Sequence, residues 1–491
     1  MDDLEKLISK IKDYNPKADF GLIQKAFEFG QLAHLNQKRA SGEPYFVHPY
    51  STAMSLADYR MDSVSIAVGL LHDTVEDAGI SLEEIRKEFG EEVVGLVEAV
   101  TKVSGIKLRG SSEEIFVENL RKMILAMARD LRAIIIKLCD RLHNMMTLRY
   151  LSPERQKKIA RETIEMYAPL AERLGMGEMK GLLEDLAFPY LYPDEYRKLV
   201  DYSRPYYKKT EDFLEKATKA VYKALAGEEI KAKISSRPKH LYSLWQKLQR
   251  QEVEGDIEKI HDLVAMRVLV ETVKECYASL GIIHSLWTPV PTIGMRDFIA
   301  QPKPNGYRSI HTNVFSLHER ILEIQIRTFE MHEEAENGVA AHWFYASVKN
   351  QGVSGEKLKN VFAPDEKVSW VKQLVAWQDE LIDTKEFVDA LRFDGLAHRI
   401  FVFSPKGDVY DLPSRATPVD FAYAVHTQLG DEATGAKANG KMVALDYKLK
   451  SGDIVEIIKK EGTKPTEGWL DFVVTNQAKR KITAYFREKR K

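Results

Sequence analysis

Cysteine, long apolar runs and net charge are all scarce in this sequence, and each scarcity excludes a class of protein. The 491 residues include only two cysteines, Cys139 and Cys276, which excludes a disulfide framework and fits a reducing cytoplasm. No run approaches the roughly 18 apolar residues of a membrane span, and the acidic N-terminal segment lacks a signal-peptide stretch. The net charge of −1 carries no signature for nucleic acid over the chain as a whole, so any such contact requires a local patch. We therefore expect a cytoplasmic protein without membrane contact.

The chain is too long for a single hydrophobic core, and the spacing of its apolar residues changes along its length. Apolar positions three and four residues apart predict a nearly all-helical first part, whereas short β-branched runs at 263–270 and 321–328 predict a mixed sheet in the second. We expect a helical domain at 1–195, a mixed-sheet domain at 196–345, a linker and helix at 346–397, a small α+β domain at 398–460 with a hairpin near 405–407, and the start of a helical segment at 461–491.

The stretch HDTVED (72–77) places four ionisable side chains directly behind the apolar run IAVGLL. On one continuous helix His72, Asp73, Glu76 and Asp77 would share a face. A solvated charged face is the usual interpretation of such a pattern. Here the apolar run indicates a buried helix, and buried charges need partners or a metal.

Two other segments carry residues of the same chemistry. The segment LRAIIIKLCDRLHNMMTL is apolar until Asp140, after which Asn144 and Thr147 follow on the same helical face. His48 precedes Pro49, which disfavours helix at His48 and places the imidazole in a loop or at a helix start; alone, it would more often be a core or surface histidine.

Two histidines and two aspartates from three segments suit a divalent ion such as Mn²⁺, and the absence of cysteine argues against structural zinc. A metal held by His48, His72, Asp73 and Asp140 would leave Glu76 and Asp77 nearby as non-ligands, where a general base for metal-assisted hydrolysis belongs.

A second constellation lies in the mixed-sheet part. Arg237 and Lys239 stand just ahead of a predicted helix that carries Lys247, and such cations suit a polyphosphate; a solvated basic face is the alternative. Asp262 and Glu323 belong to apolar strands, where a carboxylate is unusual and is a candidate Mg²⁺ ligand.

The segment KPNGYRSIHTNVF between these carboxylates carries a turn signal at Asn305–Gly306. Tyr307 offers a flat stacking surface and His311 is polar within a strand-like run. The alternative for Tyr307 is an ordinary core aromatic.

Together, the motifs QKRASGEPYFVHP, HDTVED, CDRLHNMMTL, RPKHLYSLWQK, NGYRSIHT, EIQIRT and GVAAHWFY, in this order, resemble the long RelA/SpoT-homologue family over about residues 20–486. This family comprises bifunctional synthetase/hydrolases of the alarmone (p)ppGpp. The resemblance implies an all-α HD-type hydrolase domain, an α+β nucleotidyltransferase-like synthetase domain with a mixed sheet, and a small α+β, β-grasp-like TGS domain.

The resemblance also assigns roles to residues. In the hydrolase it implies the metal ligands named above, a catalytic acidic pair at Glu76 and Asp77, and contacts to the guanine nucleotide. The nucleotide contacts are Arg39, Asn144 and Thr147. In the synthetase it implies ATP-phosphate cations, carboxylates linked to Mg²⁺, a proton acceptor for the attacking 3′-hydroxyl, and a guanine-stacking tyrosine beside a pocket histidine. The ATP-phosphate cations would be Arg237, Lys239 and Lys247, and the carboxylates linked to Mg²⁺ would be Asp262 and Glu323. Glu323 would also be the proton acceptor. The stacking tyrosine would be Tyr307 and the pocket histidine His311.

One motif departs from the family. Where bifunctional members carry Arg-x-Lys-Asp, this chain reads Gly294-Met295-Arg296-Asp297, so Arg296 keeps the second cation while the first is lost. A hydrolase with a weak synthetase is therefore an alternative to a fully bifunctional enzyme that uses ATP and GDP or GTP, and restoring an arginine at 294 is expected to raise synthesis.

The stretch ATPVDFAYAVHT resembles the TGS domain, in which His426 would face the 3′ end of tRNA on a ribosome. Arg415 occupies a position where family members often have glycine. With the basic tail AKRKITAYFREKRK, the TGS region also favours a third interpretation, a non-catalytic ribosome or tRNA sensor, although that tail is equally typical of an exposed amphipathic helix. Full-length members continue beyond the position of Lys491, so we expect a natural short form or a truncation.

Overall fold

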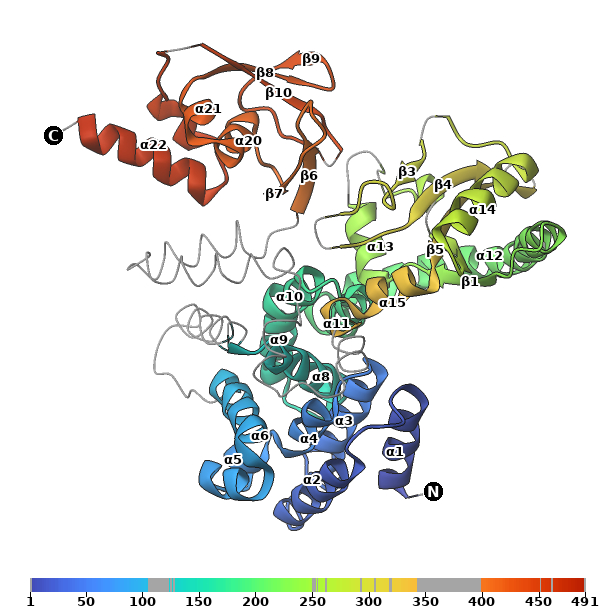
Figure 1. The fold of residues 1–491 in the computed structure, drawn as a ribbon, viewed down its shortest axis with the longest axis vertical. Coiled ribbons are helices and arrows are strands. Elements are labelled where there is room, and N and C mark those ends of the chain that lie inside the picture. Colours follow the sequence, from blue (N-terminus) through green and yellow to red (C-terminus); the bar gives the residue numbers. More distant parts are fainter. Residues whose placement is uncertain are drawn as a thin grey trace. The chain divides into compact units, whose positions relative to one another are not determined.

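A computed structural model describes residues 2–104, 123, 126, 129–249, 253, 255–260, 263–291, 294–303, 306–317, 320–341, 399–450, 452–460 and 462–489. The chain forms two compact units, one of residues 1–108 and 122–369 and the other of residues 109–121 and 370–491 (Figure 1). Within the described ranges, no helix is long and apolar enough to cross a membrane. The expected linker and helix at 346–397 lie outside the described residues.

The first part of the larger unit is predominantly helical in the described ranges, as the apolar spacing predicts. Its α-helices are α1 (Asp3–Tyr14), α2 (Phe20–Ala33), α3 (Val47–Asp58), α4 (Ser63–Leu71), α5 (Thr74–Asp77), α6 (Leu82–Ser104), α8 (Arg132–Met146), α9 (Pro153–Glu162), α10 (Ala168–Arg173) and α11 (Gly177–Leu191). Asp2, Asp19 and Asp62 cap the N-termini of α1, α2 and α4, so that backbone N–H groups without a helical partner are satisfied. Helices α3, α4 and α8 pack against one another at the centre.

The expectation of one continuous helix through residues 72–77 is wrong. Helix α4 ends at Leu71, and the four-residue α5 begins at Thr74. The Thr74 hydroxyl donates a 2.6 Å hydrogen bond to the Leu71 carbonyl across the break. Both His72 and Asp73 keep right-handed helical dihedral angles, so the four ionisable residues still emerge close together despite the interruption.

The second part of the larger unit is a five-stranded mixed sheet. Its strands are β1 (Lys233–Pro238), β2 (Val264–Val270), β3 (Arg296–Asp297), β4 (Ile310–Phe315) and β5 (Ile321–Thr328), in the order β1-β2-β5-β4-β3. Only β2 and β5 pair in parallel. The strands predicted at 263–270 and 321–328 are thus confirmed as β2 and β5. Helices α12 (Pro193–Gly227), α13 (Leu241–Leu248), α14 (Val273–Leu286) and α15 (Phe329–Asn337) complete this part.

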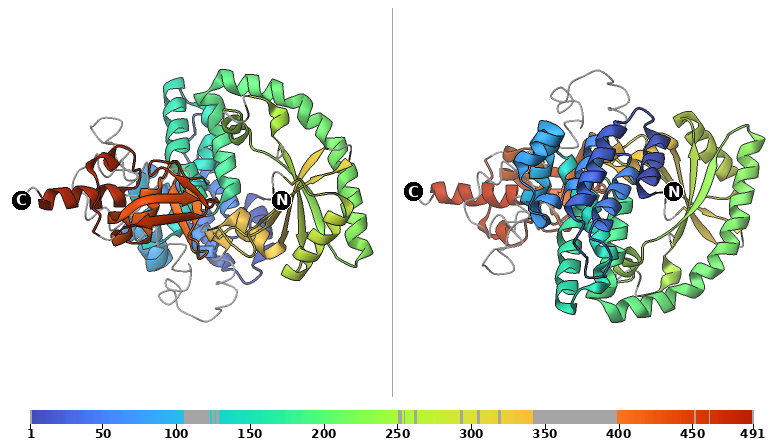
Figure 2. Two further views of the ribbon diagram at one scale, coloured as in Figure 1. Left: turned by 90° about the horizontal axis from the view of Figure 1, so that it is seen from above. Right: turned by 90° about the horizontal axis from the view of Figure 1, so that it is seen from below.

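The two faces of this sheet differ in chemistry. One face is apolar, and Met266, Val268, Ile324 and Ile326 are buried there in a core that includes residues of α12 and α14. Figure 2 shows α12 as a long arc beside the sheet. The opposite face carries an unbroken row of polar residues in register across all five strands, in the order Ser235, Arg267, Gln325, His311 and Arg296. Since residues in register share a face, strand pairing alone assembles this polar surface.

The smaller unit contains a two-stranded and a three-stranded sheet. Strands β6 (Arg399–Phe403) and β7 (Val409–Pro413) form the predicted hairpin, and β8 (Ala433–Ala438) pairs with β9 (Lys441–Val443) and β10 (Val455–Lys459). Helices α20 (Pro418–Val425) and α21 (Thr427–Asp431) follow the hairpin. The C-terminal α22 (Asn476–Lys489) packs on α20, with Ala478 and Ile482 buried against Val419 and Tyr423.

The backbone explains why Arg415 is an unusual residue at its position. Its φ angle is +74°, in the left-handed region that favours glycine, and its side chain is exposed.

We predict that Arg415→Gly makes the smaller unit more stable than Arg415→Ala does, by about 1 kcal/mol, because only glycine lacks the Cβ that makes this conformation costly. Hydrogen exchange of the full chain, followed by mass spectrometry in peptides that cover 412–449, measures the difference in local unfolding. Slower exchange in the alanine variant than in the glycine variant would contradict the left-handed conformation.

Candidate active sites

Three separate helical segments of the larger unit bring their histidines and carboxylates into one buried cluster. His48 lies in the first turn of α3, where a helix tolerates Pro49; His72 follows α4, and Asp140 lies within α8. Potential ligand atoms of these three residues all lie within 4.8 Å of one another, and all three residues are buried. Asp73 adjoins them, with its carboxylate oxygens 3.1 Å from His72 Nε2 and 3.5 Å from His48 Nε2.

The hydrogen bonds of His72 prepare it to bind a cation. Its Nδ1–H donates to the Gly69 carbonyl at 2.8 Å, which leaves the lone pair on Nε2. That buried Nε2 faces the carboxylates and has no hydrogen-bond partner among the described residues. A neutral histidine oriented by a backbone carbonyl, beside two carboxylates, is the donor set of a divalent metal site, so the residues fit such an ion.

His143 orients the second histidine of the cluster and was not identified from the sequence. Its Nδ1 lies 2.8 Å from His48 Nδ1 and 3.3 Å from an Arg39 nitrogen. Burial, together with the neighbouring His48 and Arg39, lowers the pKa of His143 to about 3. A neutral His143 therefore accepts the proton of His48 Nδ1 and leaves His48 Nε2 free to point at the cluster.

Asp140 is kept ionised although it is buried. Burial opposes its charge and is the largest single effect, but the adjacent Lys137 ammonium together with His48 and His72 outweighs it and holds the pKa of Asp140 well below its usual range. Asn144 also donates to Asp140 at 2.7 Å, as expected for residues one helical turn apart. Arg39 donates to the side chains of Asn144 and Thr147 at 3.2 and 3.3 Å, so the three predicted nucleotide contacts form one group beside the cluster.

The acidic pair lies at the solvent-facing rim of the cluster. Desolvation by the surrounding protein, only partly opposed by Lys137, raises the pKa of Glu76 to about 7. The Tyr45 hydroxyl lies 2.6 Å from Asp77 and 3.0 Å from Asp73, and so links the pair to the cluster. Tyr45 is a second residue that sequence reasoning missed; its place in the motif that contains His48 was the available signal.

The polar face of the sheet carries His311, Glu323 and Arg296 of the residues predicted for the second site. The Tyr307 hydroxyl lies 2.8 Å from His311 Nε2, and His311 Nδ1 lies 3.2 Å from Glu323. Gln325 donates to the same Glu323 carboxylate at 3.0 Å. Burial lowers the pKa of His311 despite its contact with Glu323. Arg296 pairs in register with His311, so the polar residues of the neighbouring strands β5, β4 and β3 lie side by side.

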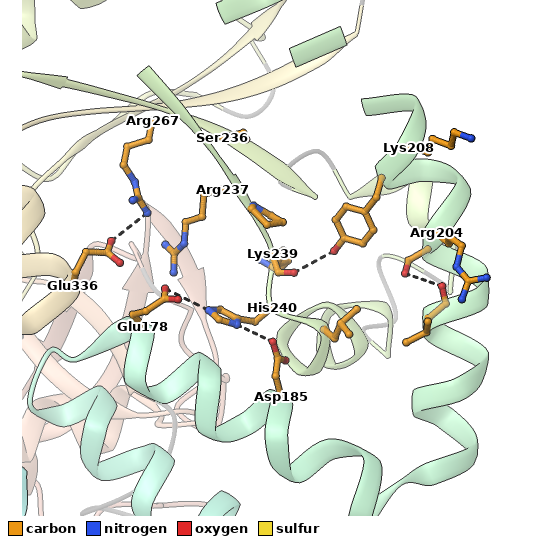
Figure 3. A pocket seen from close by; sticks show the side chains of 15 residues that line it. Glu178, Asp185, Arg204, Lys208, Ser236, Arg237, Lys239, His240, Arg267 and Glu336 are labelled. Atoms are coloured by element: carbon orange, nitrogen blue, oxygen red, sulfur yellow. Dashed lines mark hydrogen bonds and ion pairs between the residues drawn. The ribbon is translucent and has the colours of Figure 1, made fainter. Parts of the chain in front are cut away.

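A cavity of about 790 Å³ lies between α11, α12 and β1 (Figure 3). Its lining includes Arg237 and Lys239, two of the three cations proposed to bind ATP phosphates, together with Arg267. Lys247 lies on α13 outside this lining, and Asp262 lies outside the described residues. A cavity of this size suits a nucleotide, and three cations suit its phosphates.

Arg267 is the residue of this cavity that sequence reasoning missed. It interrupts the apolar strand VAMRVLV, and that interruption was the signal. Its guanidinium lies 3.1 Å from Glu336 on α15, which also binds Arg327 at 2.9 Å.

The backbone also explains the glycine at 294. Its φ is +70°, and a Cβ built there would meet nothing within 4 Å. An arginine would fit the space but would be strained by about 1–2 kcal/mol. The expected gain in synthesis from restoring that arginine is therefore opposed by backbone strain.

In the smaller unit His426 is exposed and caps α21. Its Nδ1 accepts a 3.2 Å hydrogen bond from the Gln428 N–H, which leaves Nε2 toward solvent.

Three segments of the chain match known families. Residues 26–177 match the HD domain, residues 236–350 match the region found in RelA/SpoT proteins, and residues 400–459 match the TGS domain.

The similarity to curated proteins extends over nearly the whole of this chain. A probable GTP pyrophosphokinase of Mycobacterium leprae is 44% identical over 491 residues, which cover 99% of this chain and 61% of the relative. The bifunctional (p)ppGpp synthase/hydrolase RelA of Mycobacterium tuberculosis is 44% identical, with 99% and 65% covered. The guanosine-3′,5′-bis(diphosphate) 3′-pyrophosphohydrolase of Aquifex aeolicus is 44% identical, with 99% and 67% covered.

The chain thus spans 61% to 67% of the length of these three relatives. The three matched segments occur in one order along it, and the similarity to the relatives runs through all of them. On these grounds, the chain belongs to the RelA/SpoT family.

Proposed function

We propose that this chain is a bifunctional alarmone enzyme of the stringent response. It transfers pyrophosphate from ATP to the 3′-hydroxyl of GDP or GTP, and it hydrolyses (p)ppGpp to GDP or GTP and pyrophosphate. The observation that carries the proposal is the presence, within one compact unit, of two chemically different sites: a buried histidine–aspartate cluster among helices, and a cationic cavity beside a polar sheet face.

In the hydrolase site, His48, His72, Asp73 and Asp140 would hold Mn²⁺, because the set mixes nitrogen and oxygen donors and lacks sulfur. A bound ion of this kind supplies an activated water. Arg39, Asn144 and Thr147 bind and orient the guanine nucleotide. Glu76, with a pKa of about 7, exchanges a proton near neutral pH, and Tyr45 holds Asp77 in place beside it.

In the synthetase site, Arg237, Lys239 and Lys247 neutralise the phosphates of ATP, with Arg296 as a further cation. Tyr307 stacks on guanine, and His311 fixes both the Tyr307 hydroxyl and Glu323. Glu323 accepts the proton of the attacking 3′-hydroxyl. Asp262 and Glu323 would bind the Mg²⁺ that accompanies ATP.

We predict that chelation removes hydrolysis of (p)ppGpp and that Mn²⁺ restores it better than Mg²⁺, because imidazole nitrogens form half of the donor set. Metal analysis and titration of the emptied protein with Mn²⁺ provide a measurement independent of turnover. Full hydrolysis by protein shown to contain no metal would contradict the proposed site.

We predict a double dissociation between the two sites. Asp73→Asn removes a negative donor from the hydrolase cluster, so hydrolysis should fall by several orders of magnitude while synthesis remains. Glu323→Gln removes the proposed proton acceptor, so synthesis should fall and hydrolysis should remain. Both activities are assayed on both variants, and circular dichroism and thermal melting verify folding.

Loss of both activities in either folded variant would contradict two independent sites. Negligible synthesis by the wild type, with normal hydrolysis, would support the alternative of a hydrolase with a weak synthetase. Absence of both activities in the wild type would favour a non-catalytic sensor.

We further propose that the smaller unit contacts uncharged tRNA on the ribosome through His426, in the cytoplasm. Exposure of this imidazole, with Nε2 directed to solvent, supports the proposal. The basic residues of α22, which packs on α20, supply a cationic surface within the same unit.

We predict that His426→Asn weakens binding to ribosomes that carry deacylated tRNA by about fivefold. A loss of this size is expected when one hydrogen bond or stacking contact is removed. Asparagine keeps the helix cap, so this variant separates the contact from a folding effect. The dissociation constant is measured by sedimentation at fixed salt, with His426→Ala for comparison. Wild-type affinity in the asparagine variant would exclude the imidazole as a contact.

A further inference from the structure

His240 lies directly beside the cations of the ATP cavity, at the N-terminus of α13. It was not assigned a role above. Figure 3 shows its imidazole between two carboxylates of α11, Glu178 and Asp185. His240 Nδ1 lies 2.8 Å from Asp185, and Nε2 lies 3.6 Å from Glu178.

The surface of α11 is shaped to receive this ring. Glu178 and Asp185 are two turns apart on the helix, and Gly181 lies between them. A Cβ built on Gly181 would lie 2.2 Å from the His240 ring, so a glycine is required for the imidazole to lie this close. The second Asp185 oxygen accepts a 2.9 Å hydrogen bond from the Tyr242 N–H, which ties the first turn of α13 to the same carboxylate.

The backbone of Lys239, the residue before His240, is also held by hydrogen bonds. The Lys239 N–H donates to the Leu263 carbonyl at 2.9 Å, and the Tyr207 hydroxyl donates to the Lys239 carbonyl at 3.1 Å. The backbone of the cationic segment is therefore fixed by β2 on one side, by α12 on another, and by α11 through His240.

We propose that His240 is a positioning residue of the synthetase, whose charged imidazole fixes the Arg237–Lys239 segment on α11 and neutralises two carboxylates that would otherwise repel the phosphates of ATP. This inference rests on the proposed function. The hydrogen bond to Asp185 and the ion pair with Glu178 raise the pKa of His240 to about 9, so the ring is protonated at neutral pH. Both carboxylates line the cavity, and without the imidazolium their charge would face the polyphosphate.

The test compares His240→Gln with the wild type in binding and kinetics. Glutamine keeps hydrogen-bonding capacity but removes the charge. We predict at least a tenfold rise in the dissociation constant of a non-hydrolysable ATP analogue with Mg²⁺ and in the KM for ATP, with little change in GDP binding or in (p)ppGpp hydrolysis. Lys219→Gln removes one positive charge from an exposed position of α12 and should change none of these values.

Coupling to Asp185 distinguishes positioning from packing alone. Asp185→Asn keeps an acceptor for the Tyr242 N–H but removes the ion pair, and it serves as the milder variant if His240→Gln does not fold. It should weaken binding of the ATP analogue less than His240→Gln does, because it also removes one of the two charges that oppose the phosphates, and the double variant should be no weaker than His240→Gln alone. Additive losses, or equal losses of ATP and GDP binding, would overturn the inference in favour of a merely structural contact.

The failure of this inference differs from the failure of the proposed function. Normal ATP binding by folded His240→Gln protein, in a wild type that binds ATP, overturns the inference alone. A wild type that does not bind the ATP analogue overturns the proposed synthetase and the inference together.

Discussion

The cost of burying charge without a partner governs both sites of the larger unit and the core of the smaller one. Asp140 is stabilised by Lys137 and Asn144, and the fully buried Arg327 by Glu336. In the smaller unit the buried Asp420 accepts hydrogen bonds from the backbone of Thr417, Val474 and Thr475. The bonds of Asp140 lie within α8 and the pair Arg327–Glu336 joins β5 to the helix that follows it, whereas the bonds of Asp420 join two segments distant in sequence.

The two proposed sites satisfy this requirement with different secondary structure. The hydrolase cluster collects single residues from three helical segments, and its geometry depends on how those helices pack. The synthetase face instead follows from strand register, since one polar residue per strand falls in line across the sheet. A one-residue slip of β5 would turn Glu323 into the apolar core and bring Ile324 to the polar face, so the apolar face and the polar face of the sheet maintain each other's register.

Much of this architecture was predictable because it depends on local periodicity and on motifs that keep their spacing. The helical first part, the strands β2 and β5 and the hairpin of β6 and β7 are confirmed. The break after Leu71 was not predicted, because nothing in the apolar run ends the helix and the Thr74 hydroxyl bond appears only in three dimensions. Tyr45, His143 and Arg267 were missed for a related reason: the partner of each lies far away in sequence. The motif around Tyr45 and the interrupted apolar strand at Arg267 were local signals, but neither identifies the partner.

Helix α11 belongs to two structural cores at once. Its Met179 and Leu183 are buried in the helical part of the unit, whereas Phe188 belongs to the core under the sheet and packs on Tyr242 and Trp245. The boundary between the helical part and the mixed-sheet part is therefore not a point at which the polypeptide can be divided without disturbing one of the two cores. A gene fragment that encodes either half needs α11, and two fragments that both keep it would compete for the same packing surface when mixed.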